Sequence, residues 1–351
     1  MARRSLPLYS HPCSPKKFTQ HQLFACLVLK NFLKTDYRGL VAHLADHPTL
    51  MSILDLRAVP HFTTMQKASR RLLALPKVRR LLGTSIRLHF GRQRRVKSSA
   101  ADSTGLECSS ASPYFVRRRN RIAGPWKTVV YHRYPKLGLV CDTTCHFILA
   151  LHAGRGPRPD VDEFAPLIVE ARRWMRLLRI SADAGYDSEG NHHFARDTCH
   201  IRTIIPPQIG RPTTKPASGR YRRLMQVRFD REAYHDRCQV ETVMSMIKRR
   251  QGFHTAGRSY HSQCRDLYLM ALTHNAMILV IIQVFYRAVM SLFLSPSDVP
   301  FSFPSDVPFS FPLFFPKQVF CHLERAVQQR GRIGGQAFFE PDVKLPGSQV
   351  N

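Results

Sequence analysis

The sequence contains few acidic residues. Only 24 of its 351 residues are Asp or Glu, against 53 Lys and Arg, so the formal net charge is +29. An excess of this size repels itself in a compact chain, and a polyanionic partner is the usual compensation. The basic residues do not gather in one tail but recur at 70–71, 77–80, 91–97, 117–121, 220–223 and 248–250. Clusters spread in this way favour a folded surface that follows a nucleic-acid backbone over one that binds an anionic membrane.

The chain also lacks a disulfide framework and a secretory leader. Its nine cysteines are odd in number and scattered along the sequence, which is typical of a reducing compartment. The first ten residues, MARRSLPLYS, have no apolar core of the kind that a signal peptide needs. We therefore expect a cytoplasmic protein.

One apolar run is long enough to cross a membrane. Residues 275–294, NAMILVIIQVFYRAVMSLFL, contain Gln283 and Arg287 within the run, and they lack the flanking pattern of a bilayer protein. We predict a buried terminal helix and no membrane partner, with a membrane span as the alternative.

Residues 1–95 have a helical pattern, and we predict a helical DNA-binding region there. Thr19 followed by Gln22 predicts a capping box for the helix that contains LFACLVLKNFL. A second helix is predicted over YRGLVAHLADH.

A third helix is predicted after Pro60, over HFTTMQKASRRLL, with Thr63 as its cap. Its Lys67, Arg70 and Arg71 fall on one side, as in the DNA-contacting second helix of a helix-turn-helix. A solvated helix face without DNA contacts is the alternative.

From residue 96 the pattern changes to that of an α/β domain, which we predict over 96–290. Strands are predicted in VKSSAADSTGLE, TVVYHR and LGLVCDTTCHFILALHAG. A helix over DEFAPLIVEARRWM, a strand in LLRISADAGYD, a short helix over NHHFARD and a strand in IRTIIPP follow. Strands that alternate with helices indicate a sheet layer covered by helices.

The C-terminal residues have a different composition. PSDVPFSF at 296–303 is repeated at 304–311, and prolines recur at every fourth position from Pro296 to Pro316. This spacing excludes a helix interior and a central strand. We predict that 291–351 is a proline-rich, poorly ordered tail.

The stretch YHDRCQVETVMSMIKRR, residues 234–250, predicts an amphipathic helix. At 100° per residue, Tyr234, Arg237, Glu241 and Lys248 fall within an arc of about 60°. An apolar stripe for the core lies on the other side, formed by Val240, Val243, Met244 and Ile247. The alternative to a functional site is a solvated ion pair between Arg237 and Glu241 at the i,i+4 spacing.

Two further acids follow apolar strand segments, Asp102 in ADSTGLE and Asp183 in ADAGYDS. Acids in such positions lie at the sheet edge, where α/β folds build their sites. Together with Glu241 they would repel one another unless cations lay between them, and hard divalent cations such as Mg²⁺ prefer carboxylate oxygens. Asp187 is the competing second acid, but it comes after the Gly-Tyr turn, so we prefer Asp183.

The spacing Tyr234–x2–Arg237–x3–Glu241–x6–Lys248 resembles the tyrosine–arginine–glutamate–lysine signature of bacterial insertion-sequence DDE transposases. DSTGLE and ADAGYDSEGN are similar to the first and second aspartate motifs of this family, and the resemblance covers residues 19–290. The resemblance implies that Tyr234, Arg237 and Lys248 contact transposon-end DNA.

The resemblance also implies an α/β, RNase H-like fold, a mixed sheet flanked by helices and preceded by the helical N-terminal domain. Asp102, Asp183 and Glu241 would be the catalytic residues and would hold two Mg²⁺ ions, for which Mn²⁺ can substitute. Two ions about 4 Å apart can activate the attacking oxygen and stabilise the leaving one in phosphodiester displacement.

The implied function is that of a transposase, which cleaves transposon ends and transfers the strands to target DNA. Its partners would be terminal inverted repeats and target DNA, bound by a homodimer at the nucleoid of a prokaryotic cell. Two other functions stay open. One is a non-catalytic DNA-binding relic or repressor of the element, and the other is an RNase H-like nuclease without strand transfer.

Overall fold

The computed structural model describes residues 1–108, 134–208 and 217–293. All of them lie within the first of the two units into which the chain divides, Met1–Phe309. The predicted strand TVVYHR and the predicted tail after Phe293 lie outside the described residues.

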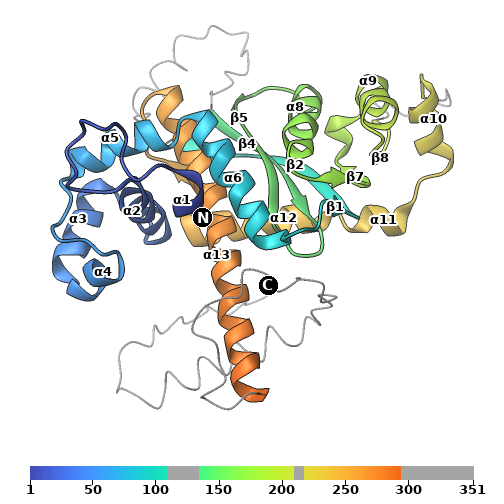
Figure 1. Cartoon of the computed structure of the whole chain (residues 1–351). Coiled ribbons are helices and arrows are strands. Elements are labelled where there is room, and N and C mark those ends of the chain that lie inside the picture. The colour runs from blue at the N-terminus through green and yellow to red at the C-terminus, as the bar shows by residue number, and fades with distance from the viewer. Residues whose placement is uncertain (109–133, 209–216, 294–351) are drawn as a thin grey trace, which may run out of the picture. The chain divides into compact units, whose positions relative to one another are not determined.

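Helices make up the N-terminal part of the chain, as predicted. They are α1 (Ala2–Ser5), α2 (Gln20–Phe32), α3 (Tyr37–Asp46), α4 (Pro48–Ile53), α5 (Phe62–Leu72) and α6 (Leu75–Phe90) (Figure 1). The capping box at the start of α2 is confirmed, because Thr19 accepts from the backbone N–H of Gln22 and the Gln22 side chain accepts from that of Thr19.

The cap of α5 differs from the prediction. Its N-cap is His61, whose side chain accepts from the backbone N–H of Thr63, and Thr63 itself lies within the first turn. The imidazole takes the capping role because His61 has extended backbone and also bonds the Thr63 hydroxyl at 2.8 Å. The prediction of Thr63 as the cap is therefore wrong, although the predicted helix forms.

The central sheet has five strands in the order β5-β4-β2-β7-β8. Their bounds are β2 (Ser99–Gly105), β4 (Tyr134–Asp142), β5 (Ile148–Gly156), β7 (Arg179–Ala182) and β8 (Arg202–Ile204). β4 runs antiparallel to β2 and β5, whereas β7 is parallel to β2 and β8 is parallel to β7. This order and these directions are those of the RNase H-like fold, so the predicted fold class is confirmed.

Two short parallel pairs flank the sheet. β1 (Arg95–Val96) pairs with β6 (Arg176–Leu177), and β3 (Glu107–Cys108) pairs with β9 (His254–Thr255).

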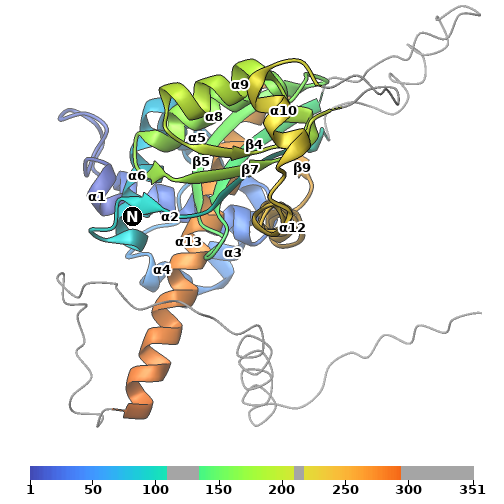
Figure 2. The same ribbon diagram turned by 90° about the vertical axis from the view of Figure 1, so that its right-hand side faces the viewer.

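Helices cover both faces of the sheet (Figure 2). On one face lie α8 (Val161–Arg172) and α9 (Glu189–His193), and on the other lie α12 (Cys238–Gln251) and α13 (Tyr260–Phe293). Between β8 and α12 the chain forms α10 (Arg220–Val227) and α11 (Arg231–His235). The N-terminal helices and the sheet contribute to one hydrophobic core, and the boundary at residue 95 stays a prediction.

The apolar C-terminal run belongs to α13. Tyr260–Ile282 is long and apolar enough to cross a membrane by length and composition, with a mean hydropathy of 1.3. Within it, the Asn275 side chain is fully buried and binds both the N–H and the C=O of Ile148 in β5 at 2.9 Å. The predicted buried helix is therefore confirmed only in part, because Asn275 and Ile278 are buried whereas Val280 is 56% exposed and the remaining described side chains of the run are half-buried. The side chains after Ile282 lie outside the described residues.

Candidate active site

The strand register brings the two predicted aspartates side by side. In the parallel pair of β2 and β7, Ala101 lies opposite Ala182, so that the next residues, Asp102 and Asp183, are neighbours. Asp183 follows β7 as predicted, and it accepts from the backbone N–H of Ala184 at 2.7 Å.

Asp102 lies inside a strand rather than after one. β2 continues to Gly105 because β4 pairs with all seven of its residues, and Asp102 lies opposite Leu139. The prediction that the strand ends before Asp102 is therefore wrong. The pairing leaves the Asp102 side chain only 22% exposed, whereas Asp183 is exposed.

The third predicted acid, Glu241, comes from the first turn of α12. The predicted apolar stripe faces the core, with Val240, Val243, Met244 and Ile247 all buried. α12 packs against β2 and β4, so Glu241 projects from the helix that covers Asp102. The helix stops where Gly252 adopts φ 96°, a conformation that favours glycine.

The predicted continuous helix over 234–250 is interrupted. α11 ends at His235 and α12 begins at Cys238. Between them the Asp236 carboxylate accepts from the Ser98 hydroxyl at 2.9 Å and from the Arg179 guanidinium at 2.7 Å. These bonds tie the start of α12 to the chain that leads into β2 and to β7, and we call Ser98, Arg179 and Asp236 the α12 anchor.

Arg237 lies among the acids. Its guanidinium is 2.5 Å from Glu241 Oε1 and 3.9 Å from Asp102 Oδ2. It also lies 5.8 Å from the centre of the Tyr234 ring. The i,i+4 pair between Arg237 and Glu241 is therefore present, but the additional contact with Asp102 distinguishes it from a simple solvated pair on a helix surface.

The pKa of Asp102 is raised to about 6, mainly by burial and to a smaller extent by the negative charges of Asp183 and Glu241. The N–H of Ser103 and the positive charge of Arg237 oppose this change. The three carboxylates are thus close enough to influence one another, and a cation among them lowers their mutual repulsion.

The chemistry of the three acids fits a hard divalent cation, which takes carboxylate oxygens as ligands. Their present spacing does not enclose one, because the described residues contain no group of three His, Cys, Asp or Glu side chains that could hold a metal ion. The positive charge within the site is that of Arg237. The three carboxylates are therefore suited to bind a metal ion if the Arg237 guanidinium moves away from them.

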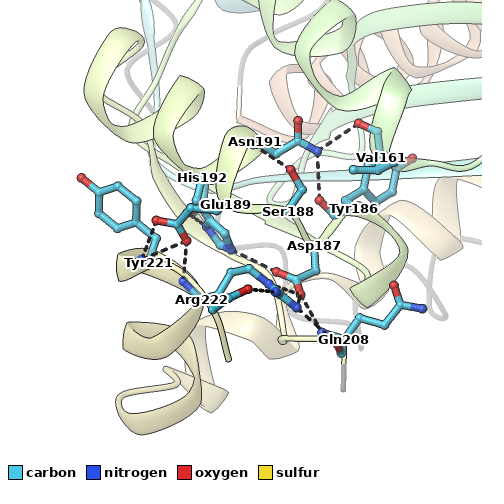
Figure 3. A network of polar contacts seen from close by, with 12 residues as sticks. Val161, Tyr186, Asp187, Ser188, Glu189, Asn191, His192, Gln208, Tyr221 and Arg222 are labelled. Carbon is cyan, nitrogen blue, oxygen red and sulfur yellow. Dashed lines mark hydrogen bonds and ion pairs between the residues drawn. The ribbon is translucent and has the colours of Figure 1, made fainter. Parts of the chain in front are cut away.

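The competing acid, Asp187, is engaged elsewhere (Figure 3). Its side chain is fully buried, pairs with Arg222 at 2.8 Å and accepts from the backbone N–H of Gln208 at 2.7 Å. The neighbouring Glu189 accepts from the backbone N–H groups of Tyr221 and Arg222, at the start of α10. Asp187 therefore fastens α10 to the sheet domain.

The model of the transposase DDE domain family matches residues 99–276. This match covers half of the chain and includes Asp102, Asp183 and Glu241. The chain belongs to the transposase DDE domain family.

Solved structures similar to this transposase include two transposase complexes. The piggyBac transposase synaptic complex with hairpin DNA is 12% identical, with a TM-score of 0.38, and the match covers 87% of this chain and 80% of that one. The Mos1 mariner paired end complex with Mn is 8% identical, with a TM-score of 0.21, covering 80% of this chain and 81% of that one. Comparison with curated proteins gives no match. TM-scores this low do not establish a shared fold, and the fold assignment rests on strand order and direction.

The other predicted DNA-contacting residues of the transposase lie in two places. Lys248 is half-buried in the last turn of α12, two turns beyond Glu241. Lys67 and Arg70 are exposed on α5, with Arg71 half-buried, and α5 packs against α2, α3 and α13. The structure therefore places Lys248 on the same helix as Glu241 but does not bring the three α5 residues to the acids.

A second polar cluster behind β2 was not predicted from the sequence. Ser103 donates to Asp160, and Lys136 of β4 pairs with Asp160 at 2.5 Å and with Glu163 at 3.4 Å. Side chains alternate along a strand, so Ser103 faces α8 while its neighbour Asp102 faces α12. The sequence did contain one signal for this cluster, which is the lysine at the start of the apolar strand PKLGLV. A lysine that is buried in such a strand requires an acidic partner.

Proposed function

We propose that this transposase cleaves DNA at the ends of a transposon and joins the freed 3′-hydroxyls to target DNA. The observation that carries the proposal is the parallel register of β2 and β7, which sets Asp102 beside Asp183 under the helix that bears Glu241. A largely buried acid with a raised pKa, placed beside a second acid and under a helix that bears a third, is typical of a catalytic site.

Asp102, Asp183 and Glu241 would hold the metal. Mg²⁺ ions, or Mn²⁺ as a substitute, would activate the attacking oxygen and stabilise the leaving one. When metal binds, the Arg237 guanidinium becomes available for a DNA phosphate, to which it can donate two hydrogen bonds. Tyr234 and Lys248 add a hydroxyl and an ammonium group from the same side of the site.

The proposed partners are transposon-end inverted repeats and target DNA, bound by a homodimer in the cytoplasm of a prokaryote. The net charge of +29 supports a polyanionic partner. The exposed Lys67 and Arg70 of α5 support end recognition by the N-terminal region, since recognition helices present such side chains to the major groove.

The test is incubation of the protein with Mg²⁺ and a DNA fragment that carries the ends of its own element, followed by separation of the products. Joined product supports the proposal. Nicked DNA without joining would identify a nuclease, and bound but uncut DNA would identify a non-catalytic binding protein. Asp102→Asn, Asp183→Asn and Glu241→Gln should each abolish cleavage and leave DNA binding intact.

A further inference from the structure

A cavity of about 480 Å³ opens at the end of the edge strand β5. It is lined by His152, Ala153, Gly154, Arg155, Arg158 and Tyr260. The last of these residues begins α13, so the cavity lies where the edge strand, the turn after it and the start of this helix meet. None of these residues takes part in the proposed reaction.

Two arginines without acidic partners give the cavity its charge. Arg155 and Arg158 are exposed, and neither forms an ion pair with any residue that the structure describes. An unpaired guanidinium has five N–H donors arranged to suit a carboxylate or phosphate. The cavity is therefore suited to an anion.

Arg155 is held through its side chain, and Arg158 through its backbone. The Arg155 guanidinium lies 4.2 Å from the centre of the Tyr260 ring, and the Tyr260 hydroxyl donates to the Ala153 carbonyl at 3.3 Å. The Arg158 carbonyl accepts from Lys136 at 2.8 Å. Stacking of this kind limits the side-chain entropy that Arg155 would lose on binding.

The buried acid Glu163 forms no ion pair with either arginine. Glu163 lies behind Gly154, where its Oε1 would be 3.1 Å from a Cβ added to the glycine. It is only 3% exposed and pairs with Lys136. The negative charge of Glu163 is thus directed at a buried lysine and away from the cavity mouth.

The register of the sheet places the cavity toward the same end of the strands as the predicted catalytic acids. Asp102, Leu139 and Leu151 form one row across β2, β4 and β5. Across the sheet, two strand spacings of together about 10 Å separate Asp102 from Leu151. Along β5, the four residues from Leu151 to Arg155 add roughly 13 Å at a right angle to this. Arg155 therefore lies roughly 16 Å from Asp102, which is about the rise of five base pairs of DNA.

We propose that Arg155, Arg158 and Tyr260 form a DNA-phosphate site, which binds the backbone of the same DNA several nucleotides from the bond that is cut. The identity of the ligand rests on the proposed function, because a DNA held at the carboxylates would pass this edge of the sheet. A second anchor at this distance fixes the direction in which the DNA leaves the acids. The orientation of the reacting phosphate is then set by the fold and not by the three acids alone.

The test is the binding of a fluorescent duplex of random sequence across a salt series, in EDTA so that no cleavage occurs. The Arg155→Ala/Arg158→Ala double variant should lower the slope of log affinity against log salt by about two units, one for each phosphate that the variant no longer binds. The matched control is Arg95→Ala/Arg176→Ala. Both of these arginines are exposed and lie in β1 and β6, which come just before β2 and β7, at the end of those strands away from the acids.

Three outcomes decide the proposal. A loss confined to the first pair supports it, whereas an unchanged slope, or an equal loss in the control pair, overturns it. Arg155→Lys/Arg158→Lys should keep the slope, which would exclude a general loss of folded protein. The assay needs no cleavage. A protein that binds DNA but does not cut it would therefore contradict the proposed function, while the salt slopes would still test the phosphate site.

Discussion

At the scale of single residues, the site is built around a positive charge in contact with two acids. Arg237 lies against Glu241 and near Asp102, while Asp183 adds a third carboxylate beside Asp102. Like charges at this proximity make the ionised forms costly. The metal-free site should therefore store strain that binding of a cation releases, as functional sites often do.

The first prediction is that Asp102→Asn stabilises the metal-free protein above pH 6. The folded-state pKa of Asp102, about 6, exceeds its ordinary value of 3.8. The folded state therefore binds the proton more tightly, and the stability that this provides is present below pH 3.8 and lost as the pH rises through 6. The shift corresponds to at most about 3 kcal/mol. Urea unfolding of both proteins in EDTA, from about pH 4 to about pH 8, measures it.

The expected pattern is equal stability near the acid end of this range and a growing advantage for Asp102→Asn toward the alkaline end. A difference that does not change with pH would show that the ionisation of Asp102 is not what destabilises the site. The same variant should have no cleavage activity, since one of the three proposed metal ligands has lost its charge.

The second prediction concerns Lys248. If its ammonium binds a DNA phosphate, Lys248→Ala should lower the salt slope of DNA binding by about one unit. The thermal midpoint should stay near that of the parent, because Lys248 forms no ion pair within the described residues. Arg249→Ala is the matched control on the same helix turn, since Arg249 is exposed on another face of α12. Equal effects of the two variants would show that Lys248 contributes only general surface charge to DNA binding.

At the scale of secondary-structure elements, the break between α11 and α12 sets the position of Glu241. The α12 anchor joins this break to β7 and to the residue that precedes β2. Because Asp102 lies in β2 and Asp183 directly follows β7, the anchor fixes α12 relative to both aspartates. The α12 anchor therefore affects the reaction by positioning Glu241 and not by contacting DNA.

The third prediction is that Asp236→Asn lowers the rate of cleavage roughly 10- to 100-fold, as expected for a displacement of about 1 Å in the position of Glu241. DNA affinity in EDTA should stay unchanged, because Asp236 faces Ser98 and Arg179. Single-turnover cleavage and equilibrium binding measure the two quantities. An equal loss of binding would assign Asp236 to the DNA interface.

The fourth prediction separates the two candidate aspartates. Asp187→Ala removes the buried partner of Arg222 and should lower the free energy of unfolding by about 3 kcal/mol. Asp183→Ala should leave the free energy of unfolding nearly unchanged, because Asp183 is exposed, and should abolish cleavage. Urea unfolding and a cleavage assay of both variants measure this. The reverse pattern would make Asp187 the second acid of the site.

Local sequence patterns were sufficient to predict most secondary-structure elements and the three candidate acids in their order along the chain. The period of the apolar residues gives α2, α3, α8 and α12, and the β-branched runs give the strands. Details that depend on distant partners could not be predicted. The helix breaks at Asp236 because Arg179, 57 positions earlier, binds its carboxylate. β2 passes through Asp102 because β4 pairs with it, and no property of ADSTGLE alone indicates that pairing.

At the scale of the whole molecule, the folded unit draws its core from residues well before the tail. The buried apolar residues of the described chain extend from Leu6 to Ile278, and the repeated PSDVPFSF segments begin at residue 296. Prolines at every fourth position cannot extend α13 or add a central strand to the sheet. The stability of the sheet and its helices should therefore not depend on the tail.

The last prediction is that a chain ending after Phe293 unfolds at the same temperature as the full-length protein and binds DNA with the same salt slope. The sequence from 294 to 351 contains Lys317, Lys344 and a small number of arginines, so its removal leaves nearly all of the basic clusters in place. Calorimetry and the salt series with a random duplex measure the two quantities. Insoluble or destabilised protein would mean that the Phe-rich repeats cover an apolar surface, and the folded region would then extend beyond Phe293. A reduced salt slope with unchanged stability would instead assign the tail a direct part in holding DNA.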